Sequence, residues 1–178
     1  MIELSTIRDL VTIFGVIAGF SYYVLTVRNT SKARKTQVVL NLSNVQNSEE
    51  TNKKYVTLLS MQWEDFEDFR KKYDSTVNPD HYAIRWKHWT YFENLGYMLN
   101  QNIVDIDMVY NMLGGNALIQ FWDKFKPIII EQRKLYNDPS YFRWWEYLMT
   151  EIYKYREENN LVGSYQSDNY KTEFEIPT

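Results

Sequence analysis

Two charged residues stand inside apolar stretches of the sequence, where a side chain can be buried and do chemistry. Glu93 lies between Phe92 and Leu95, and Arg133 follows a run of three isoleucines at positions 128–130. An isolated buried charge is very costly, so each side chain needs a partner. We predict that Glu93 and Arg133 form an ion pair between two helices. Further charged residues that can join this network are Arg85, Arg143 and Glu146.

The predicted pair has two possible roles. A buried ion pair can fix the register of two helices, and it can also shift a pKa toward the value that binding or acid–base catalysis requires. The sequence favours the structural role for Glu93 and Arg133, because both lie among packing residues.

The other residues with catalytic or metal-binding potential do not combine into a site. His81 and His88 are separated by about 10.5 Å along a helix, too far to share one zinc ion. Asp105 and Asp107 lack the Gly and Glu of a calcium loop, and Gly114-Gly115 lacks the Lys-Ser/Thr of a phosphate loop. The chain has no Cys, and no Ser-His-acid arrangement can be argued. We therefore expect a protein that is not an enzyme and that uses no metal and no cofactor.

The elements that carry these residues are predicted to be helices. Apolar residues recur every three or four positions, which is typical of helices that bury one face. The pattern predicts helices over 48–73, 80–101, 105–113, 115–135 and 140–157, and it predicts that Pro127 kinks the fourth of these without ending it. No hairpin turn separates alternating runs, so no strand is expected. The predicted fold is all-α, with a bundle of about four to five helices over residues 36–158 and a polar, flexible tail over 159–178.

The segment from Leu10 to Val27 is predicted to be a transmembrane helix. Its residues carry no charge and extend about 27 Å as a helix, close to the roughly 30 Å of a hydrocarbon core. A buried helix is the first alternative, but no face of this segment is polar. A signal peptide is the second, but Glu3 and Asp9 precede the segment and bulky residues end it, whereas a signal peptide has a basic start and a small-residue cleavage site. The anchor with its basic flank takes residues 1–35, and a stalk helix continues to residue 47.

Basic residues define the expected orientation of this anchor. Arg8 alone precedes the segment, whereas four basic residues follow it, and basic flanks stay in the cytoplasm. The expected topology has the N-terminus outside the cell and the helical domain in the cytoplasm. The four residues that we expect to contact lipid headgroups are Arg28, Lys32, Arg34 and Lys35.

Small residues and net charge limit the partners of the chain. Gly15 and Gly19 form a G-x-x-x-G pattern, which lets two membrane helices approach closely and predicts a helix contact with a second copy or another subunit. Beyond residue 35 the chain has 15 basic and 21 acidic residues, a net charge of −6. An acidic domain is a poor nucleic-acid binder, so membrane lipid and protein are the expected partners.

The order of several packing residues resembles a known family. These residues are Tyr91-Phe92-Glu93-Asn94-Leu95-Gly96, Ile106-Asp107, Tyr110, Gly114, Phe121-Trp122, Pro127, Ile130, Arg133 and Phe142 to Leu148. They are similar to those of a family of uncharacterised prokaryotic single-span membrane proteins with a helical cytoplasmic domain of unknown function. The resemblance covers about Tyr55 to Tyr155 plus the anchor. It implies an architecture and brings no activity.

Three functions are compatible with this sequence. The favoured one is a membrane-anchored, non-enzymatic scaffold or adaptor, which needs an exposed apolar or aromatic patch on its domain. The alternative is an accessory single-span subunit of a multi-subunit membrane enzyme complex, for example of the archaeal membrane monooxygenase type, which needs a contact surface along its span. The third is an enzyme that uses Glu93 as general acid or base, which needs a pocket beside that carboxylate.

Overall fold

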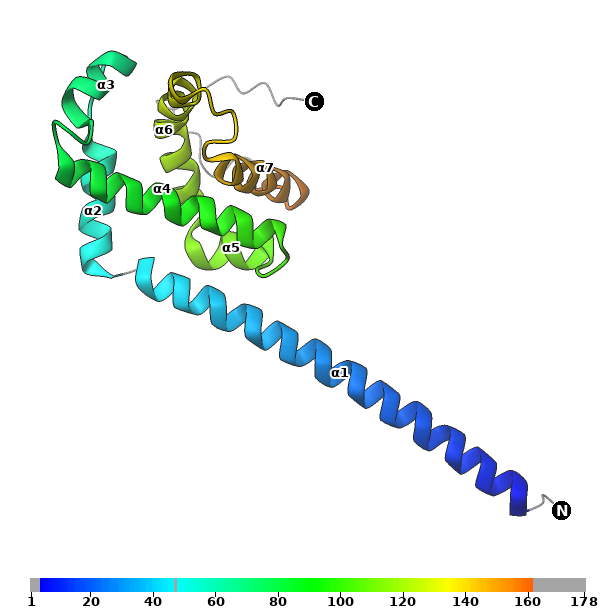
Figure 1. Ribbon diagram of the computed structural model, residues 1–178. Helices are drawn as coiled ribbons and strands as arrows, with labels where there is room; N and C mark the ends of the chain where they lie inside the picture. Colours follow the sequence, from blue (N-terminus) through cyan, green and yellow to red (C-terminus); the bar gives the residue numbers. More distant parts are fainter. Residues whose placement is uncertain (1–3, 47, 162–178) are drawn as a thin grey trace. The chain divides into compact units, whose positions relative to one another are not determined.

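Seven α-helices and no strand make up residues 4–46 and 48–161, the part of the chain that the computed structural model describes (Figure 1). The prediction of an all-α fold, with one long apolar helix followed by a helical bundle, is confirmed. Residues 1–38 and residues 39–178 form separate units, and we describe each by itself. The predicted tail lies outside the described residues from position 162 onward.

The first helix, α1 (Leu4–Gln46), contains the predicted anchor and the predicted stalk without a break. Its 43 residues extend about 65 Å at the helical rise of 1.5 Å per residue. Among the described helices it is the one that is long and apolar enough to cross a membrane, and its apolar window has no buried residue. The end of α1 belongs to the second unit, where Val39 is fully buried and the Ser43 hydroxyl donates to the Met112 carbonyl at 3.3 Å.

Two short helices stand where the sequence predicted one helix over 48–73. They are α2 (Glu49–Ser60) and α3 (Phe66–Tyr73), and residues 61–65 separate them. Ser48 caps α2, as its sequence position indicates. The prediction of an unbroken helix was wrong because Asp65 starts a new helix: its carboxylate accepts the Asp68 backbone N–H at 2.8 Å.

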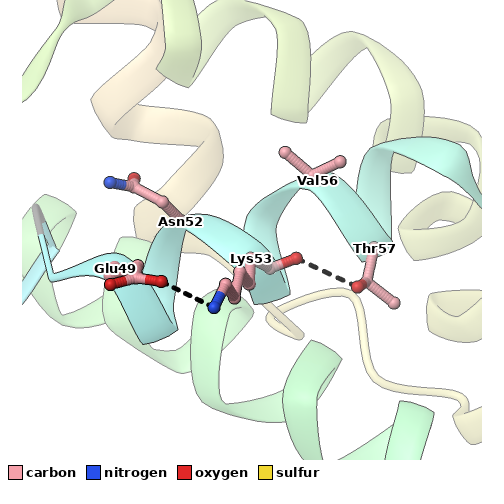
Figure 2. Close-up of a pocket in the computed structure, with 5 residues that line it drawn as sticks. All are labelled: Glu49, Asn52, Lys53, Val56 and Thr57. Atoms are coloured by element: carbon pink, nitrogen blue, oxygen red, sulfur yellow. Dashed lines mark hydrogen bonds and ion pairs between the residues drawn. The ribbon is translucent and has the colours of Figure 1, made fainter.

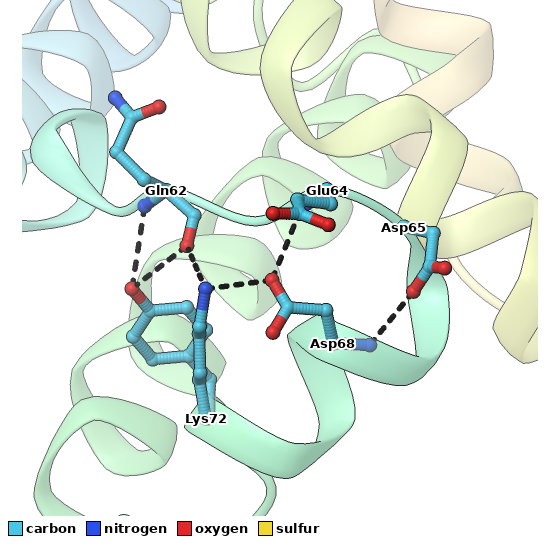
Figure 3. A network of polar contacts seen from close by, with 6 residues as sticks. Gln62, Glu64, Asp65, Asp68 and Lys72 are labelled. Carbon is cyan, nitrogen blue, oxygen red and sulfur yellow. Dashed lines mark hydrogen bonds and ion pairs between the residues drawn. The ribbon is translucent and has the colours of Figure 1, made fainter.

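Polar contacts hold the connection between α2 and α3 in place (Figure 3). The Lys72 ammonium lies 2.6 Å from the Asp68 carboxylate and 3.4 Å from the Gln62 carbonyl. Asp68 also accepts the Glu64 backbone N–H at 3.0 Å. The acidic residues of this segment therefore act as caps and ion-pair partners at the surface, and the aromatic residues between them face inward.

The centre of the domain is α4 (Pro79–Asn100), which starts with Pro79 at its first turn and Asn78 as its cap. It packs along α7 (Arg143–Glu158), as Figure 1 shows. Their interface is aromatic: the ring of Trp145 lies 5.0 Å from that of Phe92 and 6.0 Å from that of Trp89. Aromatic pairs of this kind add about 0.5–1.5 kcal/mol each beyond the area that they bury.

A glycine sets the distance between α4 and α7. Gly96 is buried, and a Cβ atom added there would lie 1.8 Å from the Trp144 carbonyl oxygen and 3.2 Å from the Leu148 Cβ. The two helix backbones therefore touch at this point, and no side chain larger than hydrogen fits.

The remaining helices are α5 (Ile106–Leu113) and α6 (Gly115–Tyr136). Gly114 joins them in the left-handed region with φ +76°, a conformation that suits glycine. Pro127 lies inside α6, so the prediction that it does not end this helix is confirmed. α7 begins three residues later than predicted, because Phe142 adopts a left-handed conformation with φ 54° and separates residues 138–141 from the helix.

Candidate binding site

Glu93 caps the N-terminus of α7 from a different helix. Phe142, at the cap position of α7, makes no side-chain cap hydrogen bond. Instead, the Glu93 carboxylate on α4 accepts the Trp145 backbone N–H at 2.8 Å. Burial raises the pKa of Glu93, while the backbone N–H groups of Trp145 and Trp144 and the charge of Arg133 lower it. A carboxylate at this position also suits the positive end of the helix dipole.

Arg133 holds the segment before α7 and pairs with Glu146. Its guanidinium donates to the carbonyl oxygens of Tyr141 at 2.8 Å and Phe142 at 3.3 Å, and it forms an ion pair of 2.7 Å with Glu146. The predicted direct pair of Glu93 with Arg133 is therefore corrected. Both residues act on the start of α7, but Glu93 binds its N–H groups and Arg133 binds the carbonyl groups just before them.

Removal of the Glu93 cap should destabilise the domain. We expect Glu93→Ala to lower the free energy of unfolding by about 1–2 kcal/mol, the usual cost of a lost cap, and Glu93→Gln, which keeps an acceptor oxygen, to change it by less than about 0.5 kcal/mol. Urea unfolding of the full chain in detergent micelles, followed by circular dichroism, measures both. Because the folded-state pKa of Glu93 is raised, its contribution is complete below the unfolded pKa and falls as the pH rises through the folded pKa. The Gln variant should lack this pH dependence.

The exposed Glu157 in the last turn of α7 provides a control for this experiment. Glu157→Ala removes a carboxylate without removing a cap and should leave stability unchanged. Equal losses in the Ala and Gln variants of Glu93 would contradict the capping role, since they would assign the effect to charge.

His81 and His88 stack on different aromatic residues and do not form a shared site. His88 is buried, stacks on Phe121 at 6.0 Å and contacts the Ile84 carbonyl through Nδ1 at 2.8 Å, and burial lowers its pKa. His81 stacks on Tyr73 at 5.8 Å. Within the described residues, no group of three or more His, Asp or Glu side chains is arranged to hold a metal ion.

A buried arginine without an acidic partner forms the centre of the most distinctive site. Arg85 on α4 is 3% exposed, and its guanidinium carbon lies 4.6 Å from the ring centroid of Phe69, 5.0 Å from Trp89 and 5.2 Å from Tyr82. In the described part of the chain, no carboxylate pairs with it and its Nη1 atom has no hydrogen-bond partner. Burial lowers the pKa of Arg85, whereas its electrostatic interactions with Tyr141, Tyr82 and Asp74 raise that pKa. The three ring contacts replace part of the lost hydration.

Arg85 lines a small cavity between α3, α4 and α6. Further lining residues are Arg70, Asp74 and Gln132, and the cavity volume is about 20 Å³, enough for one water-sized group. Arg70 Nε and Gln132 Oε1 are also buried without a hydrogen-bond partner, although Arg70 Nε lies 3.8 Å from Asp74. Three residues that line the cavity therefore each have a buried polar atom without a hydrogen-bond partner, which costs about 1–3 kcal/mol per atom.

Aromatic side chains surround the mouth of this cavity at the protein surface. Tyr136 and Leu135 of α6 are both about half exposed, and both line the cavity together with Tyr82. Trp86 is 43% exposed and stacks on Tyr82, with ring centroids 6.1 Å apart. We name these four residues, Tyr82, Trp86, Leu135 and Tyr136, the aromatic patch.

Only a weak sequence signal indicates this site. Arg85 appeared as a possible member of the Glu93 network, but the structure places it in a separate cavity against α3. The spacing of Tyr82, Arg85 and Trp89 on one helix face indicates cation–π contacts. The lack of an acidic partner among the described residues, which distinguishes the site, depends on the packing of two other helices, α3 and α6, and could not be predicted.

The surface of α2 has a shallow, open pocket with fewer features of a binding site than the Arg85 cavity. Figure 2 shows the residues that line it, all of which come from α2: Glu49, Asn52, Lys53, Val56 and Thr57. Lys53 pairs with Glu49 at 2.6 Å, and the Thr57 hydroxyl donates to the Lys53 carbonyl at 3.0 Å. These are ordinary contacts along one exposed helix, and the hollow offers no converging polar groups.

The predicted membrane-contact residues are all on α1. A Cβ atom added at Gly15 or at Gly19 meets nothing within 4 Å, so this face has room for a second helix. Arg28, Lys32 and Arg34 are exposed, and Lys35 is half-buried. Their contacts with lipid or with another helix stay predictions.

The fold and the site define a class of protein first. It is an all-α protein with one long apolar N-terminal helix and a helical domain in which the buried Arg85 lies beside the partly exposed Tyr82 and Tyr136. By its sequence, the chain belongs to the DUF4760 family, a domain of unknown function that matches residues 10–152. The match begins in the apolar part of α1 and ends in α7, which confirms the expected uncharacterised family. Comparisons with curated proteins and with solved structures give no significant match.

Proposed function

We propose that this protein is a non-enzymatic adaptor anchored in the cell membrane by α1, with its helical domain in the cytoplasm. The observation that carries this proposal is the aromatic patch. Trp86, Leu135 and Tyr136 are each more than 40% exposed, whereas core side chains such as Trp89 and Trp145 are almost completely buried. Exposed aromatic groups around a cavity are typical of surfaces that bind protein.

The anchor and its orientation are supported by α1. Its apolar window is unburied, its length exceeds that of a membrane span, and four basic residues follow the apolar stretch. Arg28, Lys32, Arg34 and Lys35 then contact anionic headgroups of the inner leaflet, each contributing about 1 kcal/mol near the surface. The catalytic alternative has less support, because the Glu93 carboxylate binds the N-terminus of α7.

One observation favours the second candidate function, an accessory subunit of a membrane enzyme complex. Gly15 and Gly19 leave an open face on α1 for a close helix contact. The two functions therefore use different surfaces, and variants of each surface distinguish them.

We expect the proteins that co-purify with the chain in mild detergent to be lost when the aromatic patch is changed. A Trp86→Ser, Tyr136→Ser variant removes two exposed rings. A Val56→Ser variant on α2, where Val56 is 63% exposed, is the matched control and should retain the partners. Quantitative mass spectrometry compares the three samples, and thermal melting confirms that each variant is folded. Loss of the partners from a Gly15→Leu, Gly19→Leu variant alone would reject the adaptor and favour the accessory subunit.

A further inference from the structure

Arg85 places a positive charge beside the cavity next to the aromatic patch, and no carboxylate in the described part of the chain forms an ion pair with it. Arg85 is nine-tenths buried or more and faces the cavity, and its Nη1 atom is unpaired in the described part of the chain. A second arginine, Arg70, has an Nε atom without a hydrogen bond, but its guanidinium pairs with Glu67 at 3.4 Å and with Asp74 at 3.8 Å. A guanidinium with free donors is best matched by a planar carboxylate.

The size of the cavity restricts the group that can enter. A volume of about 20 Å³ admits one water-sized group, so one carboxylate oxygen fits. Gln132, which is 6% exposed, lines the same cavity, and its amide oxygen has no hydrogen-bond partner in the described part of the chain.

The apolar residues around the cavity indicate which kind of molecule the carboxylate belongs to. Tyr82, Leu135 and Tyr136 line the cavity, and their rings and side chains offer apolar contact around its opening. A free carboxylate ion would leave this rim uncovered, whereas an acidic side chain with apolar neighbours would cover it. The net charge of −6 beyond residue 35 does not attract acidic proteins at a distance. Arg85 therefore selects for an acidic side chain only through direct contact.

We propose that Arg85 binds the carboxylate of one acidic side chain, supplied by a partner protein whose neighbouring apolar residues cover the aromatic patch. This inference rests on the proposed adaptor function and specifies the chemistry of the partner. The partner segment places an Asp or Glu among aromatic or aliphatic residues. Its carboxylate places one oxygen in the cavity and accepts hydrogen bonds from Arg85.

Peptide display on the full chain in lipid nanodiscs tests this proposal. Random twelve-residue peptides are selected for binding that the Trp86→Ser, Tyr136→Ser variant lacks. We expect the selected peptides to share one acidic residue beside an aromatic or aliphatic one. Change of that residue to its amide should weaken binding at least tenfold, because the Arg85 donors lose their charged acceptor.

A double-mutant cycle assigns the effect to Arg85. In the Arg85→Met variant the acidic peptide and its amide form should bind with equal affinity. Arg85→Met should not lower the melting temperature, because Met fills the space without burying an unpaired charge. If the variant does not fold, the acid-to-amide comparison on the unchanged chain still decides the question.

The outcomes separate this inference from the adaptor function. Patch-binding peptides without an acidic residue, or acid and amide forms of equal affinity, would overturn the role of Arg85 and leave the adaptor function intact. A failure to select any patch-dependent peptide would overturn both. Equal binding of sodium acetate and the peptides would show a site for free carboxylates and would also reject the proposal.

Discussion

The Gly96→Ala variant should lose at least about 3 kcal/mol of folding free energy. Its new methyl group would stand 1.8 Å from the Trp144 carbonyl oxygen and 2.5 Å from the carbonyl carbon. Both atoms belong to the backbone of α7, so the neighbour cannot rotate away as a side chain does. Overpacking of a rigid core typically costs 1–3 kcal/mol, and a backbone contact lies at the upper end of that range or beyond it.

Separation of α4 from α7 would also weaken the contacts around the glycine. The Glu93 carboxylate one turn earlier would move away from the Trp145 N–H, which it now holds at 2.8 Å. We expect the melting temperature of the full chain in detergent micelles to fall by about 10 °C or more, as measured by circular dichroism. Gly19→Ala is the matched control, since its added Cβ meets nothing within 4 Å. A melting temperature within about 2 °C of the parent chain would contradict the close contact.

Single cysteines should react with a membrane-impermeant maleimide from opposite sides of the membrane. The chain contains no Cys, so Ser5→Cys and Thr76→Cys each introduce a unique thiol at an exposed position. In intact cells we expect near-complete labelling of the Ser5→Cys variant and almost none of the Thr76→Cys variant, with the second labelled after lysis. The reason is the hydrocarbon core of roughly 30 Å that would separate the two positions.

Three results of the labelling experiment have different meanings. The reversed pattern would reject the orientation inferred from the basic flank. Labelling of both positions from the same side would reject the span itself, and with it the anchor. The cysteine-free parent chain gives the background, and a membrane-permeant maleimide should label both variants in intact cells.

Most of the fold could be predicted because helix-forming periodicity is a local property. The bounds of α4 and α5 lie within one residue of the predicted ranges, and Pro127 was correctly placed within α6. The break at residues 61–65 was missed for a physical reason. The apolar spacing of Leu59, Trp63 and Phe66 continues across it. From the sequence alone, Asp65 is equally compatible with an exposed position within a helix and with the N-cap of a new helix.

The chemistry of the site was only half predictable. The sequence correctly marked Glu93 as a carboxylate within an apolar face that needed a partner, but it supplied the wrong one. Side-chain patterns predict which charged groups share a region of the fold. They cannot show that the donor to Glu93 is a backbone N–H group of another helix, that of Trp145. Arg85 was harder to predict, because its importance lies in a partner that is missing among the residues of α3, α4 and α6.

The capping of α7 by Glu93 has a consequence for how the domain is synthesised. α7 makes no side-chain cap hydrogen bond of its own, so it depends on a carboxylate 52 residues earlier in the chain. A ribosome needs roughly 3–12 s to add the residues between the end of α4 and the end of α7 at about 5–20 residues per second. During that interval the face of α4 that packs on α7 lacks its partner helix, whereas α2 and α3, which precede α4 in the chain, are already available to it.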